Sequence, residues 1–336
     1  TEFEKINGFS ELIIKAQLIN KSDEYRKSIQ GKILIIDLGY RKITDFHKVE
    51  TGDSVEDLII KAILPQVDGQ EKKLVKVPDE LKEFLPMASY INLSDNDISE
   101  LPDWIFRDKL KGLYVANNKL SEFPKWPKNL HNLEELDLSN NQISKISETE
   151  FLRGKGRLKY INLSWNELTS IDFFVFNLRN LERIDLSFNK IESYLPPDYF
   201  RGNKKLKAIL LDFWCEIGNY NNLDFSYTPQ LEFLSLEGHE IGLYLKDGLG
   251  ADNIADDYDD EMMDCFEVFD YLQDMGIYEL KKLRYLNLSC NGLSVLPKNF
   301  FGIQSLETLE LKDNEFSEEQ KVFIKIMFPK IETLYF

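Results

Sequence analysis

The chain has 336 residues, of which 43% are hydrophobic and 29% are charged, a composition typical of folded globular proteins and not of disordered ones. Its formal net charge of −17 would repel a phosphate backbone, so nucleic acid is excluded as an expected partner. No apolar run approaches the roughly 18 residues needed to cross a bilayer, so we expect no membrane span.

The first 86 residues form a region without a clear internal pattern. In chain order we expect a helix at Phe9–Ile29, a strand at Ile33–Leu38, a helix from Ser54 to Leu64 that ends before Pro65, and a strand at Leu74–Val77. The simplest interpretation of residues 1–86 is an N-terminal α/β cap over the apolar edge of the domain that follows. The alternative is a separate functional α/β domain.

From residue 87 to residue 336 the pattern L-x-x-L-x-L-x-x-N-x-L recurs, and equivalent leucines between Leu93 and Leu236 follow one another every 22 to 25 residues. Two degenerate copies have Trp214 and His239 in the asparagine position, and a partial copy, Ile331–Phe336, ends the chain. The copies that keep the asparagine contain Asn96, Asn118, Asn141, Asn166, Asn189, Asn291 and Asn314.

Each repeat predicts one short strand whose alternating apolar residues point inward, followed by an asparagine that turns the chain and bonds neighbouring coils. A returning segment such as Leu296-Pro297 to Phe300 closes the coil. One coil cannot bury its own apolar face, so stacked coils must supply the core.

This pattern resembles the leucine-rich-repeat family, in a bacterial form without cysteine-rich caps. The resemblance implies an α/β fold, a curved leucine-rich-repeat solenoid with a parallel β-sheet on the concave face. It also implies a role in protein recognition, without a cofactor.

Three cysteines, Cys215, Cys265 and Cys290, are too few and too scattered to form a disulfide framework. The first ten residues lack a basic segment followed by an apolar core, so we expect no signal peptide there. These features favour a cytoplasmic location, with secretion or surface attachment as the alternative.

The residues between the buried leucines should face solvent on the sheet. Trp165, Phe188 and Phe213 occupy the same position, one before the asparagine position, in three successive repeats, so we expect a contiguous stack of rings. Such a patch either binds a partner or packs beneath the neighbouring insertion. The other partner-binding candidates on this face are Tyr114, Asp137, Tyr160, Asn162, Asp185, Asp212, Phe233, Glu237 and His239.

An insertion at about residues 246–279 interrupts the repeats and holds twelve acidic residues against one lysine. A helix is expected from Glu261 to Met275. The acidic residues either form a solvated face of a docked helix, recognise a basic partner, or bind calcium. Calcium is disfavoured because the spacing of an EF-hand is missing. The binding candidates here are Asp256, Asp257, Asp259 and Asp260.

No phosphate-binding glycine loop, zinc-binding motif or nucleophile elbow occurs in the sequence. Cys215 and His239 form the one conceivable nucleophile and base, without an orienting third group. We therefore expect a non-catalytic module, without metal or cofactor, that binds a protein with a basic surface. The alternative is an adhesion protein that recognises a glycan or host ligand; the oligomeric state is not predicted.

Overall fold

The structure is a computed structural model, and it describes residues 34–37, 58–61, 66–67, 70–71, 73–77, 79, 82, 88–125, 131–146, 157–171, 178–191, 195–213, 223–239 and 275–336. The chain divides into two compact units, Thr1–Asn162 and Leu163–Phe336. Each unit is a stretch of parallel repeat coils, so the predicted solenoid fold is confirmed. Of the predicted insertion, the structure describes only residues 275–279. The helix expected from Glu261 to Met275 lies outside the described residues except for Met275.

In the first unit the strands lie in the order β2-β1-β5-β6-β7-β8. Their central residues are in register, because Ile91 pairs with Leu113, Leu113 with Leu136 and Leu136 with Ile161. The strands are β1 (Leu34–Asp37), β2 (Leu58–Lys61), β5 (Ala88–Asn92), β6 (Gly112–Tyr114), β7 (Glu135–Asp137) and β8 (Tyr160–Asn162), with a separate antiparallel pair of β3 (Gln66–Val67) and β4 (Gln70–Glu71).

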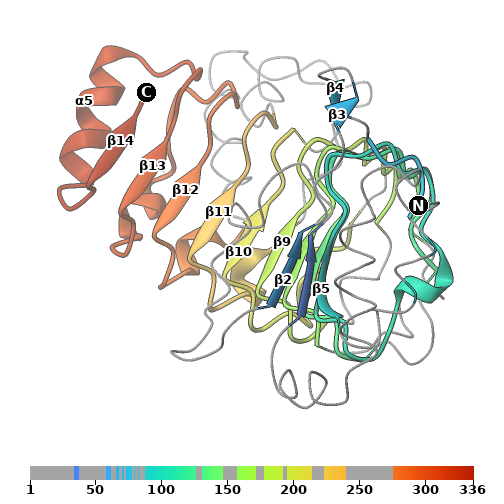
Figure 1. The fold of residues 1–336 in the computed structure, drawn as a ribbon. Coiled ribbons are helices and arrows are strands. Elements are labelled where there is room, and N and C mark those ends of the chain that lie inside the picture. The colour runs from blue at the N-terminus through green and yellow to red at the C-terminus, as the bar shows by residue number, and fades with distance from the viewer. Residues whose placement is uncertain are drawn as a thin grey trace, which may run out of the picture. The chain divides into compact units, whose positions relative to one another are not determined.

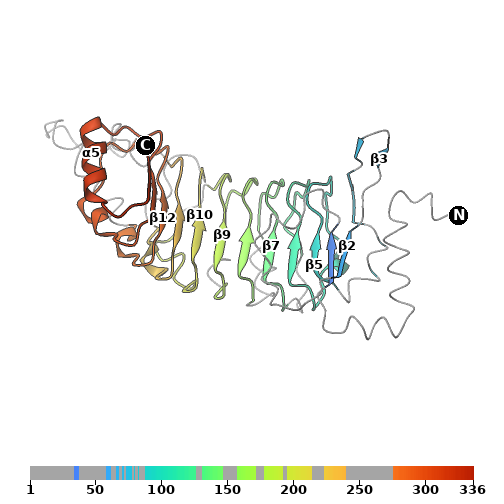
Figure 2. The ribbon, with the colours of Figure 1, turned by 60° about the vertical axis from the view of Figure 1, so that its left-hand side comes forward.

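In the second unit the strands follow the order β9 to β14, each parallel to the next (Figure 1). The central residues of the first five of these strands are in register and completely buried. They are Ile184, Ile209, Leu234, Leu286 and Leu309. The strands are β9 (Arg183–Asp185), β10 (Ala208–Leu210), β11 (Phe233–Ser235), β12 (Tyr285–Asn287), β13 (Thr308–Glu310) and β14 (Thr333–Tyr335). Helix α5 (Glu318–Met327) connects the last two strands (Figure 2).

The returning segments close with 3₁₀ turns, which a proline precedes in two cases. Proline fixes its own φ near −65° and therefore favours entry into a tight turn. Pro102 precedes η4 (Asp103–Ile105), which buries Ile105, and Pro297 precedes η10 (Lys298–Gly302), which buries Phe300 and Phe301. The other two such turns are η6 (Phe225–Tyr227) and η9 (Ile277–Glu279).

The asparagines bond the coils together as expected. The Asn118 side chain is 8% exposed, and its Nδ2 donates to Leu93 O of the preceding coil at 3.0 Å. The same amide donates to Val115 O and Ala116 O, while its Oδ1 accepts from Ile98 N at 2.9 Å. A buried amide thus satisfies backbone groups that no strand reaches.

Three predictions for the N-terminal region can be compared with the described residues. The strand expected at Ile33–Leu38 is confirmed as β1. The helix expected from Ser54 to Leu64 is wrong, because Leu58–Lys61 is strand β2, whose β-branched isoleucines pair with those of β1. The strand expected at Leu74–Val77 is also wrong: Leu74 N instead donates to Asn96 Oδ1 at 2.8 Å, in an irregular turn.

The remaining N-terminal expectation, a helix at Phe9–Ile29, lies outside the described residues. Strand β1 lies between β2 and β5, so residues before 87 contribute strands to the sheet of the first unit. That arrangement suits a capping region, and the boundary at residue 86 stays a prediction.

Candidate functional site

Trp165, Phe188 and Phe213 form the stack of rings that the sequence predicts, here called the aromatic ladder. The ring centroids of Trp165 and Phe188 are 4.0 Å apart with an interplanar angle of 14°. Those of Phe188 and Phe213 are 5.1 Å apart with an angle of 25°. Trp165 is 55% exposed and Phe213 39%, so the ladder lies at the surface of the second unit.

The backbone beneath the ladder is in the left-handed region, with φ of 55° at Trp165, 55° at Phe188 and 44° at Phe213. We call this residue, one before the asparagine position, the turn position of each repeat. The other residues there with positive φ are Asp95, Asn117, Asn140, Gly238, Cys290 and Asp313. Glycine, asparagine and aspartate adopt this conformation readily, whereas a bulky residue there is uncommon and costs about 1–2 kcal/mol.

A strained residue persists only where the surrounding structure or selection maintains it, and such residues cluster at functional sites. Three successive bulky aromatics at strained turn positions therefore mark the ladder as a candidate functional site. The sequence gives the position of these residues in the repeat but not their backbone conformation.

The strain has a consequence for stability. We expect the exchange of Trp165 for asparagine to change the free energy of unfolding by no more than about 1 kcal/mol, because relief of the left-handed strain offsets the lost ring stacking. Urea unfolding of the Trp165→Asn variant measures this difference. A loss above about 3 kcal/mol would show that Trp165 is a core residue.

Gly238 occupies the turn position that follows Phe213. Its φ is 72°, and a Cβ atom built on it would lie 2.2 Å from Cε1 of Phe213. The ring of Phe213 therefore lies against the glycine backbone, and Gly238 is a supporting residue that the sequence analysis missed. Glycine in a turn is too common a signal to reveal this contact.

We expect Gly238→Ala to lower the free energy of unfolding by about 1–2 kcal/mol from the positive φ, and by more where the Phe213 ring must move. Gly302→Ala is the matched control, because nothing lies within 4 Å of its added Cβ. Urea unfolding of both variants compares them. Equal stability of the two would refute the contact between Gly238 and the ring.

Next to the ladder lies a row of carboxylates, Asp185, Asp212 and Glu237, one from each of three consecutive coils. Asp212 Oδ1 accepts hydrogen bonds from Ser235 Oγ at 2.6 Å and from Glu237 N at 2.8 Å. Glu237 Oε2 accepts from Asn287 Nδ2 at 2.9 Å. We call these three residues the carboxylate row.

Burial raises the pKa of Asp185 and of Asp212, although hydrogen bonds from serine oppose the rise in both. For Asp212 the neighbouring charges of Glu237 and Asp185 raise the pKa further. Like charges therefore accumulate in this row.

A second aromatic group lies on the same sheet face. Phe233 and Tyr285 stack with centroids 4.0 Å apart and an interplanar angle of 2°. The Tyr285 hydroxyl donates to Glu310 Oε1 at 2.8 Å. Phe233 was a predicted candidate, whereas Tyr285 was not; Tyr160, in the first unit, is half-buried.

Three other candidates, like Asp185 of the carboxylate row (9% exposed), are too buried to contact a partner in this conformation. Tyr114 is 4% exposed and donates its hydroxyl to Glu135, while Asp137, 7% exposed, accepts from Ser139 N at 2.9 Å. His239 is 4% exposed, and its Nε2 lies 2.6 Å from Leu211 O. Their positions in the template suggested exposure, but short strands pack these side chains closely against their neighbours.

His239 takes the structural role of the missing asparagine. Its ring nitrogen bonds a carbonyl of the preceding coil, as Asn189 Nδ2 bonds Leu163 O at 2.9 Å. Burial lowers the pKa of His239 to about 4, so the ring is neutral at pH 7. His239 therefore belongs to the core and not to the candidate surface.

Of the remaining candidates, the structure describes only Asn162. Asn162, in the first unit, is half-buried on the sheet face. Asp256, Asp257, Asp259, Asp260 and Cys215 lie outside the described residues. The ladder and the carboxylate row are thus the predicted residues that the structure brings together.

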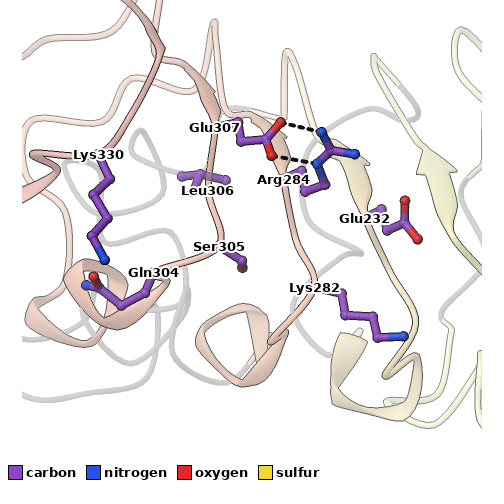
Figure 3. A pocket seen from close by; sticks show the side chains of 8 residues that line it. All are labelled: Glu232, Lys282, Arg284, Gln304, Ser305, Leu306, Glu307 and Lys330. Atoms are coloured by element: carbon purple, nitrogen blue, oxygen red, sulfur yellow. Dashed lines mark hydrogen bonds and ion pairs between the residues drawn. The ribbon is translucent and has the colours of Figure 1, made fainter.

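A shallow depression of about 540 Å³ lies at the edge of the sheet where β11, β12 and β13 begin (Figure 3). Within it Arg284 and Glu307 pair through two hydrogen bonds of 2.8 and 2.7 Å. The other lining residues are Glu232, Lys282, Gln304, Ser305, Leu306 and Lys330. This side-chain set contains no nucleophile with an adjacent base, so the depression is not an active-site candidate.

Among the described residues, no group of three or more His, Cys, Asp or Glu side chains is arranged to hold a metal ion. The Cys290 thiol lies between the carboxylates of Glu237 and Asp313, each 3.8 Å away, and its pKa is raised by burial and by these charges. A thiol with a raised pKa is a poor nucleophile. No helix in the described part of the chain has the length and apolar character needed to span a membrane.

Three models of the leucine-rich repeat match the chain, over residues 108–153, 156–217 and 282–303. Together with the stacked coils, these matches show that the chain contains leucine-rich repeats. Among curated proteins, none matches the sequence.

The fold is similar to that of solved bacterial structures. A leucine-rich-repeat protein from Leptospira interrogans is 24% identical, with a TM-score of 0.57, over 78% of this chain and 58% of that one. The functional domain of InlJ from Listeria monocytogenes is 18% identical, with a TM-score of 0.47, over 77% and 50%. An internalin, InlF, from Listeria monocytogenes is 18% identical, with a TM-score of 0.45, over 79% and 77%.

The chain spans 58% and 50% of the length of the first two of these proteins. At such identities the likeness concerns the fold. Leucine-rich-repeat proteins are generally protein-interaction scaffolds, and the fold suggests a protein-interaction module.

Proposed function

We propose that this chain binds a partner protein through the sheet face of its second unit, with the aromatic ladder as the centre of the contact. The observation that carries the proposal is a stack of three aromatics, of which Trp165 and Phe213 are exposed and Phe188 is half-buried, at turn positions where asparagine or glycine would be less strained. Exposed aromatic side chains are the residues that most often dominate the binding energy of protein interfaces.

The partner surface that fits best is basic. The carboxylate row lies beside the ladder, and the chain as a whole carries a net charge of −17. Complementary charge speeds encounter and selects partners more than it adds affinity. The acidic segment 246–279 would assist in attracting such a partner, as the sequence suggests.

The adhesion alternative, recognition of a glycan, requires a different ring geometry. Sugars stack their C–H faces on the open face of an aromatic ring. In the ladder both faces of Phe188 are covered by its neighbours, so at this ring only the edge remains for a ligand. This arrangement favours a protein partner over a glycan.

The proposal includes no catalysis. The described residues contain neither a nucleophile activated by a base nor a metal cluster, and the family consists of binding scaffolds.

Affinity capture from a lysate of the source organism tests the proposal. The intact chain is compared with a Trp165→Asn/Phe188→Asn/Phe213→Asn variant and with a variant lacking residues 247–278. Phe323→Ala is the control, because Phe323 is an aromatic residue of α5 that is 46% exposed and belongs to neither group on the sheet face.

A protein retained by the intact chain and the control, but lost by the folded ladder variant, supports the proposal. Capture of the same proteins by all four forms would reject the ladder as the binding surface. Loss of the protein only on deletion would place the contact on the insertion.

A further inference from the structure

We infer that the group which the ladder and the carboxylate row bind is a lysine or arginine side chain of the partner, with its aliphatic stem along the ring edges of Phe188 and Phe213 and its charged end at Asp212 and Glu237. This inference rests on the proposed function and specifies the chemistry of the partner. Two features of the site support it independently.

The first feature is the orientation of the rings. Because Phe188 stacks between Trp165 and Phe213, both of its faces are covered and its edge is left for contact. Ring edges carry partial positive charge and do not attract a cation as ring faces do. The ladder therefore suits the methylene groups of a long side chain, not its charged end.

The second feature is a charge without a counter-ion. Asp212 directly precedes Phe213, the last ring of the ladder. Glu237 directly precedes Gly238, against which the Phe213 ring lies, so both carboxylates are next to residues at this end of the ladder. Their hydrogen-bond donors are neutral groups, namely Ser235 Oγ, the Glu237 amide, Asn287 Nδ2 and the Cys290 thiol.

In the part of the chain that the structure describes, neither carboxylate lies within ion-pair distance of a lysine or arginine, although Lys312 is near enough for the charge of Glu237 to raise its pKa. Lys312, which lies on a later coil, pairs with Glu310 at 2.9 Å and lies over the Tyr335 ring. Burial raises the pKa of Asp212, and the charges of Glu237 and Asp185 raise it further, so an incoming cation relieves a repulsion that already exists.

Lysine and arginine satisfy both features, because each carries an apolar stem that contacts apolar surface and a charged end that stays with polar groups. A short cation would leave the ring edges uncovered, and an apolar side chain would leave the carboxylates without a partner.

The test uses a fluorescent twelve-residue peptide of alternating lysine and alanine, at about 0.15 M salt so that long-range attraction is screened. One analogue has norleucine in place of lysine, which keeps the stem and removes the charge. A second has 2,3-diaminopropionate with its side-chain amine converted to a guanidinium, which keeps the charge at neutral pH and removes most of the stem. A fourth peptide has arginine in place of lysine. All are titrated against the intact chain.

We expect the lysine and arginine peptides to bind at least tenfold more tightly than either analogue. The Asp212→Asn/Glu237→Gln variant should bind the lysine and arginine peptides no more tightly than the norleucine peptide. The Phe188→Asn/Phe213→Asn variant should bind them no more tightly than the diaminopropionate peptide. Glu100→Gln/Glu122→Gln is the control, because it removes two exposed carboxylates of the first unit and should leave binding unchanged.

Equal binding of the lysine and diaminopropionate peptides would overturn the inference, since the rings would then have no role. If the Glu100→Gln/Glu122→Gln control loses as much affinity as the Asp212→Asn/Glu237→Gln variant, the inference is also overturned, because binding would then depend on the net charge of the chain. If the capture experiment still identifies a ladder-dependent partner, only the chemistry inferred here fails and the proposed function stands.

Discussion

Replacement of Asn118 by alanine should lower the free energy of unfolding of the first unit by about 3–4 kcal/mol. The Asn118 amide forms four hydrogen bonds to backbone groups of its own and the preceding coil. Alanine leaves Ile98 N without its partner in a buried place, which costs about 1–3 kcal/mol, and it removes three further bonds of about 0.5–1.5 kcal/mol each, although Leu93 O keeps its bond from Asn96 Nδ2. Urea unfolding followed by circular dichroism measures the change.

Asn132→Ala is the matched control for this prediction. Asn132 Nδ2 also donates to a carbonyl of the preceding coil, Asp108 O, but at an exposed place where water can replace it. Its loss should therefore lower stability by less than about 1 kcal/mol. Similar losses in the two variants would mean that burial of the asparagine is not what makes its bonds stabilising.

Stability should also decrease as the pH falls from 6.5 to about 4, with His239 as a main contributor. The folded ring has a pKa of about 4, whereas an unfolded histidine titrates near 6.5. Above pH 6.5 the ring is neutral in both states; below it the unfolded state binds a proton that the folded state does not. The contribution reaches about 3 kcal/mol at pH 4, at about 1.4 kcal/mol per unit of pH.

The His239→Asn variant isolates this effect. Asparagine is the consensus residue there, so stability at pH 7.5 should stay within about 1 kcal/mol of the intact chain. The difference in free energy of unfolding between the two forms, measured from pH 7.5 to 4, should shift by about 3 kcal/mol in favour of the variant. Asp185 and Asp212, whose pKa values are raised, titrate in both forms and cancel in the difference. A constant difference across this range would refute the assignment.

Much of the fold could be predicted from the sequence, because the repeat spacing places each buried leucine and each bonding asparagine. The prediction failed where the spacing gave no guidance, at Leu58–Lys61. A short apolar run with a plausible N-cap fits a helix as well as a strand. There the pairing of β2 with β1 decides the structure, and that pairing is a tertiary contact.

The ladder was predictable because its residues share a template position, and position fixes neighbours in a stack of coils. The burial of Tyr114 and His239 was not, since it depends on how tightly adjacent side chains pack. Nor was the role of Gly238, which rests on where the Phe213 ring points. Side-chain packing of this kind leaves no periodic trace in the sequence.

The left-handed turn position has a wider consequence for how such repeats change over generations. Most substitutions at an exposed site are nearly neutral and accumulate without selection, but at this site the backbone itself opposes any bulky residue. Mutation should therefore return it to asparagine, aspartate or glycine whenever nothing keeps the larger residue in place. Large residues that persist there in descendants of this chain would mark the surface that its partner keeps under selection, and repeats in which they have reverted would mark a lost or changed partner.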